Sequence, residues 1–444
     1  MISLATLRHV MEGAIPATIA TCAPDGTPNV SFVSQVHYVD EEHVALSFQF
    51  FSKTRENVLA NPRASVLALH PETGGVYRFE LAYLRTETDG PLFESMKAKL
   101  AGIASHTGMS GVFRLLGADV YRVCDVERVP GREVAPPARP DLLPAVRRVV
   151  DRILPCTDLG ALLDGFLSAL EAELHVHHAM VLLADADGRQ LYTVATRGYA
   201  HSGIGSEIAF GHGVIGAAAQ ARTPIRLMHA ATEYSYGRTV RERAEARGMT
   251  DALSEEIPFP GLARSGSQLA VPIVAGTRLV GVLYVESSEE RRFRYDDEDA
   301  LVILADHLGL AVRLLQQGAE RDDDSPAQAL RMPQPAGAPL AIRHYPEQHS
   351  VFVDDDYLIK GVAGAILWKL LGAYAREGRT EFTNRELRLD PAIGLPELSE
   401  NLEARLILLQ RRLAERCAFL RLEKTGRGRL RLVVARPLRL LEST

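Results

Sequence analysis

The sequence predicts a chain of three domains: a small β barrel, an α+β domain, and a helical domain that ends in a β-hairpin. Three observations support this fold class. The 444 residues suffice for roughly two to four domains of ordinary size. Two segments rich in proline and charge, "VPGREVAPPARPD" (129–141) and "GAERDDDSPAQALRMPQPAGAP" (318–339), interrupt the chain. Apolar residues alternate with period two before the first segment and follow mixed, then helical, spacing after it.

We therefore expect domains at 1–130, 142–317 and 343–441, with a flexible linker at 318–342. A net charge of −6 excludes a nonspecific nucleic-acid binder, so any basic site must be local. The four cysteines form no CxxC pair, which argues against a zinc ribbon, an iron–sulfur site or a disulfide scaffold, and we assign no metal. Because neither a signal peptide nor an apolar run of about 18 residues is visible, we expect a cytoplasmic protein without a membrane partner.

The first domain is predicted to consist mostly of strands. The stretch "AIPATIATCAPDGTPNVSFVSQVHYVDEEHVALSFQF" alternates apolar and polar residues and is broken by Asp-Gly and by Asp-Glu-Glu, which is typical of antiparallel hairpins. "GVYRFELAYLRTETDG" adds a strand, "PLFESMKAKLAGIA" a helix, and "VFRLLGADVYRVCDVERV" the final strands. Period-two strands with few helices favour a small barrel.

A candidate anion site follows one of these strands. Ser52, Lys53 and Thr54 end the strand just before "RENVLANP", where a helix begins. Phosphate sites favour a cation, hydroxyl donors and the free backbone N–H groups of a helix start, and this stretch supplies all three. A solvated strand end is the alternative interpretation of the same residues.

The stretch "ATIATCAPDGTPNVSFVSQVHYVDEEHVALSFQFFSKTRENVLANPRASVLA" resembles the pyridoxamine-phosphate-oxidase-like family of FMN-binding split barrels. The resemblance implies a β split barrel, FMN as cofactor, and a homodimer with the cofactor between two protomers. It implies that Ser52, Lys53 and Thr54 hold the flavin phosphate. The residues implied beside the isoalloxazine ring are Asn29, Val30, Ser31, Phe32, Gln49 and Phe50, with Asn57 as a further candidate.

The family includes oxidases, reductases and haem-handling members, so the resemblance leaves the activity open. The barrel ends at "YRVCDVERVPGREV" without the Arg- and Trp-rich tail of pyridoxamine phosphate oxidases, so we do not expect vitamin B6 synthesis. Haem is the alternative cofactor, with His37, His43 and His70 as candidate ligands, although lone histidines on strands are more often structural or solvated. We assign no catalytic residue.

The second domain begins with two amphipathic helices, "LLPAVRRVVDRILPC" and "LGALLDGFLSALEAEL", continues with strands and closes with a helix, which predicts an α+β domain. "FGHGVIGAAAQARTPIRL", "SQLAVPIVAGTRLVGVLYVESS" and "YDDEDALVILADHLGLAV" resemble a GAF domain. The resemblance implies a small-molecule site in the variable region 228–266, where Tyr234, Tyr236 and Arg238 are suited to an anionic or planar ligand. A solvated helix with paired charges is the alternative. "HVHH" (175–178) is interpreted as a surface cluster rather than a metal site.

The third domain is predicted to contain a helix at 361–377, a short helix "TNRELRL" capped by threonine, and a long helix "LSENLEARLILLQRRLAERC". A hairpin "AFLRLEKTGRGRLRLVVA" follows, and helix–helix–helix–hairpin is a winged-helix order. These segments resemble the winged helix-turn-helix of response regulators, with a buried stripe of Leu402, Leu406, Leu409 and Leu413. Between positions 405 and 439 there are eleven Lys or Arg residues and two Glu.

This local basic patch predicts contact with double-stranded DNA. The candidate residues are Arg405, Arg411, Arg412, Arg427 and Arg429, and we expect the face of the long helix that carries its arginines to be free for a groove. Ile407 and Leu408 stand where recognition helices usually carry polar side chains, so a protein interface is the alternative. Leu430 also replaces the aromatic residue that is usual in the wing.

The sequence thus favours a cytoplasmic, signal-responsive regulator in which flavin-type and GAF sensory domains control a DNA-binding winged helix. The alternative is an FMN-dependent oxidoreductase with appended regulatory domains, in which the winged helix binds protein. A set of proton-donating or substrate-binding residues facing the flavin would separate the two hypotheses, and no such set is evident in the sequence.

Overall fold

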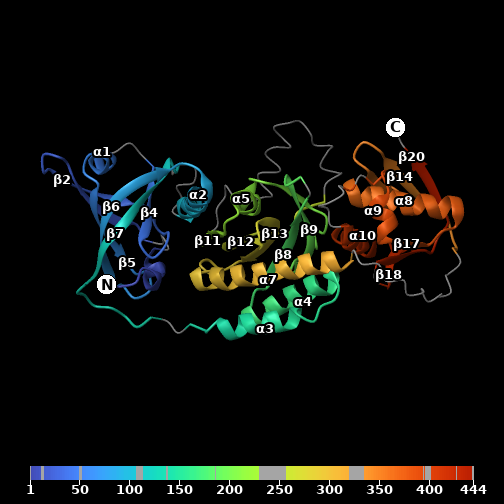
Figure 1. Ribbon diagram of the computed structural model, residues 1–444, viewed down its shortest axis with the longest axis horizontal. Helices are drawn as coiled ribbons and strands as arrows, with labels where there is room; N and C mark the ends of the chain where they lie inside the picture. The colour runs from blue at the N-terminus through green and yellow to red at the C-terminus, as the bar shows by residue number, and fades with distance from the viewer. Residues whose placement is uncertain are drawn as a thin grey trace.

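Three groups of elements lie in a row along the molecule, with the N-terminal group at one end and the C-terminal group at the other (Figure 1). We call them the barrel domain, the middle domain and the C-terminal domain. The computed structural model describes residues 2–11, 15–49, 53–106, 114–136, 139–185, 187–229, 257–319, 335–393, 395, 402–426 and 428–442.

The barrel domain is built on one antiparallel sheet in the order β2-β1-β5-β6-β7-β4-β3. Buried and less buried residues alternate along its strands, as the period-two pattern predicted, and the buried ones form the barrel core. Gly26 turns β1 into β2 with a φ of +88°, which explains the Asp-Gly pair there. The elements are η1 (Ala5–Met11), β1 (Ala17–Cys22), β2 (Pro28–Val33), β3 (Val36–Tyr38), β4 (His43–Phe48), α1 (Lys53–Ala60), β5 (Arg63–Leu69), β6 (Val76–Glu87), α2 (Gly90–His106) and β7 (Gly117–Val129).

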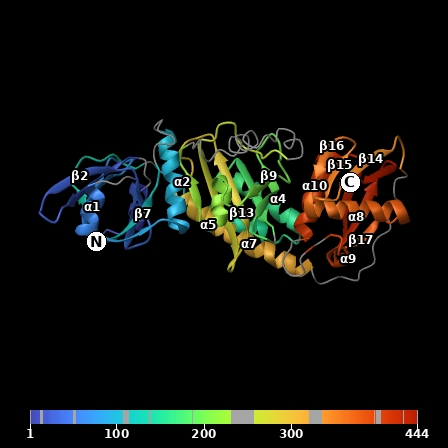
Figure 2. The ribbon, with the colours of Figure 1, turned by 90° about the horizontal axis from the view of Figure 1, so that it is seen from above.

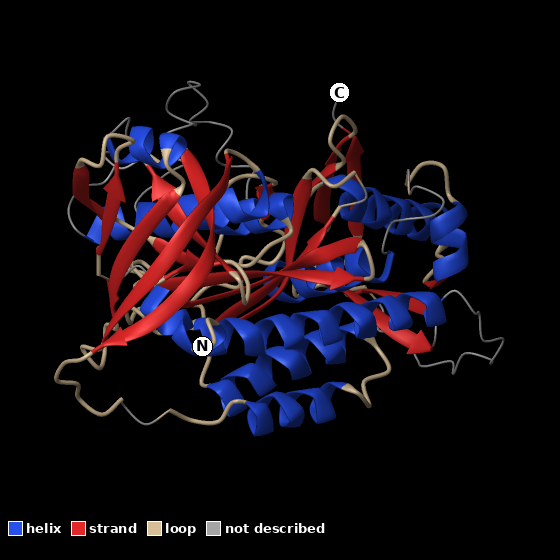
Figure 3. Ribbon diagram, turned by 60° about the vertical axis from the view of Figure 1, so that its left-hand side comes forward, coloured by secondary structure: helices blue, strands red, loops and turns tan. Residues whose placement is uncertain are grey.

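The middle domain is an antiparallel sheet in the order β10-β9-β8-β13-β12-β11 between two helical layers. Helices α4 and α7 pack on one face of the sheet, and α3 is stacked on both of them (Figure 3). Helix α5 packs on the other face. Helix α4 begins where Asp158 accepts a hydrogen bond from the backbone N–H of Ala161, an N-cap. The elements are α3 (Leu143–Ile153), α4 (Leu159–Leu174), β8 (His178–Ala184), β9 (Gln190–Arg197), β10 (Glu207–Ala209), α5 (Gly213–Ala221), β11 (Ile225–Leu227), β12 (Ser267–Ala275), β13 (Arg278–Ser287) and α7 (Tyr295–Ala319).

The C-terminal domain contains two small sheets around its helices. One has the order β16-β15-β14-β20, with β14 and β20 parallel, and the other has the order β17-β19-β18. Thr383 caps α9 by accepting a hydrogen bond from Glu386 N at 3.2 Å, as predicted. The elements are β14 (Leu340–Tyr345), β15 (Ser350–Val353), β16 (Asp356–Ile359), α8 (Gly361–Glu377), β17 (Glu381–Thr383), α9 (Asn384–Leu389), α10 (Leu402–Arg416), β18 (Leu420–Gly426), β19 (Arg429–Val434) and β20 (Leu438–Glu442).

Two features of this domain differ from the sequence analysis. Strands β14 to β16 and β20 were not predicted. The pairing of β20 with β14 spans nearly the whole domain and leaves no local signal, whereas β14, β15 and β16 pair locally through short turns that the sequence analysis missed. Strand β14 begins at Leu340, so the last residues of the predicted linker 318–342 belong to a sheet. The described start of that linker, Gly318 and Ala319, completes α7.

Both junctions between domains are closely packed. Helix α2 lies between the barrel sheet and the middle domain, where it packs on β11 and α5 (Figure 2). Helix α10 packs on α4 and β9 at the other end of the middle domain. One cluster of buried apolar residues runs without interruption from the middle domain into the C-terminal domain. Among the described residues, none of the helices is both long enough and apolar enough to cross a bilayer.

Candidate functional sites

A cavity of about 140 Å3 opens beside the start of α1 in the barrel domain. Its walls come from β2, from the end of β4, from α1 and from β7. Four residues that the sequence analysis placed at the flavin share this cavity: Ser31, Phe32, Gln49 and Thr54. Segments far apart in the chain therefore converge as expected for one small-molecule site.

The start of α1 has the features of an anion site. Lys53 is its first residue and is exposed, and the first backbone N–H groups of a helix have no acceptor within the helix. Asn29 donates a hydrogen bond from Nδ2 to Oγ1 of Thr54 at 2.9 Å, which ties β2 to this turn. Phe50 and Ser52 lie outside the described residues.

Two other candidates lie away from the cavity wall. Asn57 is buried and donates to Oγ1 of Thr21 at 3.1 Å, so its amide supports the fold behind α1 rather than lining the cavity. Val30 points outward from the edge strand β2, with 67% of its surface exposed. Its neighbours Asn29 and Ser31 lie on the opposite face of the strand.

Arg55 is a cavity residue that the sequence analysis missed. Its guanidinium forms an ion pair with Asp119 of β7, donates to Oγ1 of Thr86 at 2.8 Å, and lies 4.4 Å from the centroid of the Phe48 ring. Burial alone lowers the pKa of Arg55, but the hydrogen bond and the charge of Asp119 outweigh burial and raise it. No local pattern could reveal this pair, because its members are 64 positions apart.

Buried amide groups near the cavity have unused hydrogen-bonding capacity. Gln49 donates from Nε2 to Oγ of Ser47, but its Oε1 has no protein partner. Gln35 is 1% exposed, and neither Nε2 nor Oε1 of its side chain has a partner. Buried polar groups without partners are costly, and of these two residues Gln49 lines the cavity, where a ligand with an N–H donor would satisfy its Oε1. The free acceptor of Gln49 and the helix start at Lys53 therefore fit a flavin, which has a ring N–H and a phosphate.

The three histidines proposed as alternative haem ligands are all engaged elsewhere. His37 is buried beside Lys99, and His43 bonds to the carboxylate of Asp40. His70 accepts hydrogen bonds at Nδ1 from the backbone N–H groups of Glu72 and Thr73. Within the described ranges, no group of three or more His, Cys, Asp or Glu side chains is arranged to hold a metal ion, the "HVHH" segment included.

The GAF-type ligand residues proposed from the sequence, Tyr234, Tyr236 and Arg238, lie outside the described residues. The described part of the middle domain contains a buried polar group that the sequence analysis did not identify. Glu286 accepts a hydrogen bond from the backbone N–H of Leu262 at 3.0 Å and one from the hydroxyl of Tyr284 at 3.4 Å. Burial raises the pKa of Glu286, although these hydrogen bonds oppose the shift.

The arginines of α10 do not form a free face, and this corrects the sequence analysis. Arg411 donates to Asp164 of α4 and to the carbonyl oxygen of Val194, both at 2.7 Å. Arg405 lies with its guanidinium carbon 3.8 Å from the centroid of the Tyr192 ring. Both side chains therefore face the middle domain, because α10 crosses the exposed end of α4 and β9.

Arg412 also lies on that face, with its side-chain stem beside Gly205 of the middle domain, but its guanidinium turns toward its own domain. It is 6% exposed and donates from Nε and Nη2 to the carbonyl oxygen of Leu358 in its own domain. Burial lowers its pKa, and the nearby Glu415 only partly compensates. Arg412 therefore stabilises the C-terminal domain internally. Arg427 lies outside the described residues.

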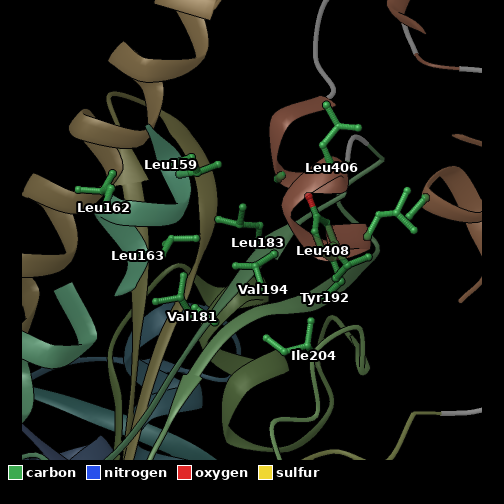
Figure 4. Packing of buried hydrophobic residues seen from close by; sticks show 14 of the residues in the cluster. Leu159, Leu162, Leu163, Val181, Leu183, Tyr192, Val194, Ile204, Leu406 and Leu408 are labelled. Atoms are coloured by element: carbon green, nitrogen blue, oxygen red, sulfur yellow. The ribbon is translucent and has the colours of Figure 1, made fainter. Parts of the chain in front are cut away.

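The apolar pair in α10 has a structural explanation. Leu408 is 4% exposed and lies beside Tyr192 in the cluster shared by the two domains (Figure 4). Ile407 is half-buried and lines a cavity of about 310 Å3 between α4, α10 and the β18–β19 hairpin. The protein-interface interpretation of these two residues therefore describes the contact seen here, with the middle domain as the partner. Arg429 lies on the hairpin wall of the same cavity.

Family models match two parts of the chain. Residues 4–124 match the model described as pyridoxamine 5'-phosphate oxidase, and residues 156–313 match the GAF domain. The protein therefore has a pyridoxamine-5'-phosphate-oxidase-like N-terminal half-barrel and a GAF domain in the middle. The chain has no match among curated proteins.

Solved structures with similar parts include the GAF domain of an Acinetobacter phosphoenolpyruvate-protein phosphotransferase, at 20% identity over 41% of this chain and 97% of that one, with a TM-score of 0.31. An FMN-binding protein from Syntrophomonas wolfei subsp. wolfei is 14% identical over 29% of this chain and 92% of its own, with a TM-score of 0.23. Free methionine-R-sulfoxide reductase from Neisseria meningitidis is 20% identical over 39% and 89%, with a TM-score of 0.31. TM-scores this low carry no argument about function.

Proposed function

We propose that this protein is a signal-responsive regulator in which the barrel domain holds FMN, the GAF domain holds a small molecule, and the C-terminal domain is a winged helix that binds double-stranded DNA. The observation that carries the proposal is the contact between α10 and the GAF domain. A sensory domain that packs directly on α10, a helix with four arginines, can change what that helix does.

The order of elements in the C-terminal domain supports the winged-helix assignment. Helix α8 is followed by β17, α9, α10 and the β18–β19 hairpin, and β17 pairs with β19. In a winged helix the last of three helices enters the major groove and the hairpin contacts the backbone. In the proposal, helix α10 and the hairpin take these roles, with Arg405 and Arg411 on the helix and Arg429 on the hairpin.

The barrel cavity supports the flavin assignment. Lys53 and the N–H groups at the start of α1 would bind the phosphate, while Ser31, Phe32 and Gln49 would contact the ring. Bound FMN would supply a redox-active, light-absorbing ring at this position. The protein itself contributes the orientation of that ring and, through Arg55, a fixed positive charge paired with Asp119.

The exposed edge of the barrel supports a homodimer. Val30 and Phe32 project from the edge strand β2, and Phe32 is 78% exposed although it also lines the cavity. A monomer would leave this apolar side chain and one side of the cofactor in water. A second protomer over β2 would cover both.

Two measurements test the proposal on the full-length protein. The absorption spectrum of the purified protein should show oxidised flavin bands, and bands of haem, or no bands, would contradict the FMN assignment. Anisotropy titrations of a labelled random duplex should show binding at low salt, with log affinity falling by about 0.9 per phosphate contact for each unit of log salt. Arg429→Ala should shallow this slope by about one unit, whereas the matched control Arg63→Ala on β5 should leave it unchanged.

The competing hypothesis predicts other results. An FMN-dependent oxidoreductase with an output domain that only contacts protein would turn over a reduced nicotinamide or another donor. It would show no salt-dependent affinity for the duplex. Flavin bands combined with turnover and without DNA binding would therefore reject the regulator and favour the enzyme.

A further inference from the structure

Three kinds of contact hold α10 on the GAF domain, and each resembles something that DNA offers. Asp164 presents a carboxylate to Arg411 where DNA would present a phosphate. The carbonyl oxygen of Val194 is an acceptor for the same guanidinium, as base edges are. The ring of Tyr192 lies against the guanidinium of Arg405, as a base can. The GAF surface thus satisfies the same side chains that a duplex would use.

The ion pairs between the two domains all have the same arrangement of acid and base among the described residues. Besides the Asp164–Arg411 pair, Glu207 of β10 lies 3.4 Å from the ammonium group of Lys360, which precedes α8. In both pairs the acid belongs to the GAF domain and the base to the C-terminal domain. This polarity matches an acidic surface that competes with DNA for a basic one.

The GAF domain also sterically blocks the side of α10 that would enter a DNA groove. Leu408 is 4% exposed and lies in the apolar cluster with Tyr192, Val194 and Ile204 (Figure 4). A duplex cannot reach the helix surface between Arg405 and Arg411 while the GAF domain covers Leu408. DNA binding through α10 and this packing are therefore mutually exclusive.

From these contacts we infer that the GAF domain inhibits the C-terminal domain by occupying its DNA-binding face, with Asp164 standing in for a DNA phosphate. The inference rests on the proposed function and names its regulation. Any signal that favours separation of the C-terminal domain from the GAF domain raises the apparent affinity for DNA. The apparent association constant equals the intrinsic one multiplied by the fraction of molecules in which the two domains are separated.

The hairpin explains why inhibition is partial. Lys424 is exposed and Arg429 is half-buried, and both line the cavity of about 310 Å3 that opens between the hairpin and α4 of the GAF domain. They can meet phosphates while the contact is intact. The full-length protein should therefore retain weak, salt-dependent affinity and gain the α10 contacts when the domains separate.

The test changes the GAF surface and leaves every DNA-contacting residue intact. The side chain of Asp164 is 71% exposed, so Asp164→Arg replaces an ion pair by repulsion without disturbing the GAF core. Glu207→Lys breaks the second pair in the same way. Asp306→Arg makes the same charge change at an exposed position of α7 and serves as the matched control.

Asp164→Arg should tighten duplex binding by about three- to tenfold relative to Asp306→Arg, the range expected for loss and reversal of an exposed ion pair. Glu207→Lys should act in the same direction, and the double variant should exceed either. Small-angle scattering without DNA should show a larger radius of gyration for the double variant, because the C-terminal domain separates from the row of domains.

Two results overturn the inference in distinguishable ways. If wild type, Asp164→Arg and Asp306→Arg bind the duplex equally, then the GAF domain does not inhibit, while DNA binding as the proposed function stands. If no variant binds at low salt although scattering shows separation in the double variant, the proposed function fails and the inference fails with it.

Discussion

Arg55 on α1 and Asp119 on β7 form an ion pair in the wall of the barrel cavity, between elements 64 positions apart in the chain. Both side chains are largely buried, at 14% and 8% exposed. The hydroxyl of Thr86 joins them by donating to Asp119 at 2.6 Å and accepting from Arg55 at 2.8 Å. The pair therefore links α1, which carries the proposed phosphate site, to β7 inside the sheet.

Replacing Arg55 by Met should destabilise the barrel domain by about 3–5 kcal/mol, because the carboxylate of Asp119 would remain buried without its partner. The calorimetric transition of the barrel domain measures this. The double variant Arg55→Met with Asp119→Leu removes both charges and should recover most of the loss. A double variant as unstable as the single one would show that packing, rather than the orphaned charge, causes the effect.

Lys53→Ala should weaken FMN binding by about 1.5–3 kcal/mol and leave riboflavin binding nearly unchanged, since the lost charge-assisted hydrogen bond goes to the phosphate. Quenching of flavin fluorescence on titration with protein gives both affinities. Lys97→Ala, on α2 and paired with Glu94, is the matched loss of one exposed lysine. Equal losses for the two flavins would place Lys53 away from the phosphate.

Stability should fall as the pH drops below about 6.5, and His37 should account for part of the loss. Burial, then the positive charges of Lys99 and Arg226, hold the pKa of His37 well below its ordinary value. The unfolded chain takes up a proton that the folded protein does not, so unfolding gains up to about 1.4 kcal/mol per pH unit below that point.

The melting temperature of wild type and of His37→Gln, compared at pH 7.5 and 5.5, isolates this contribution. The variant should lose less stability than wild type between the two pH values. His307→Gln, at an exposed position of α7, serves as the control and should behave like wild type. A pH dependence that His37→Gln leaves intact would assign the effect to other buried histidines such as His344.

Phe32→Glu should raise the dissociation constant of the dimer by at least about tenfold, because it places a charge on the apolar edge that a second protomer would cover. Sedimentation equilibrium with FMN present measures the constant. Leu389→Glu changes another exposed apolar residue, which is 70% exposed at the end of α9, and should have no effect. A wild-type protein that is strictly monomeric at micromolar concentration would contradict the dimer itself.

Local patterns in the sequence identified most elements correctly. Alternation of apolar residues predicted the antiparallel strands of the barrel, and the helical leucine spacing of α10 predicted its buried stripe, including Leu409 and Leu413. The threonine cap at Thr383 and the turn at Gly26 were also recognisable, since capping and turn chemistry depend on a few adjacent residues. The cluster of polar residues at Lys53 marked the start of α1 for the same reason.

What the tertiary structure alone decided is which partner each surface meets. The sequence showed that Leu408 is apolar and Arg411 is charged, but the GAF residues that cover them, such as Asp164 and Tyr192, come from segments more than 200 positions earlier. The same holds for Arg412, which turned to the carbonyl of Leu358 instead of to solvent. The spacing of apolar residues shows which face of a helix is buried. The hydrophobic effect favours burial of that face against any apolar surface and does not select a particular partner. The spacing therefore does not show which element will pack on that face, because this depends on how whole domains pack together.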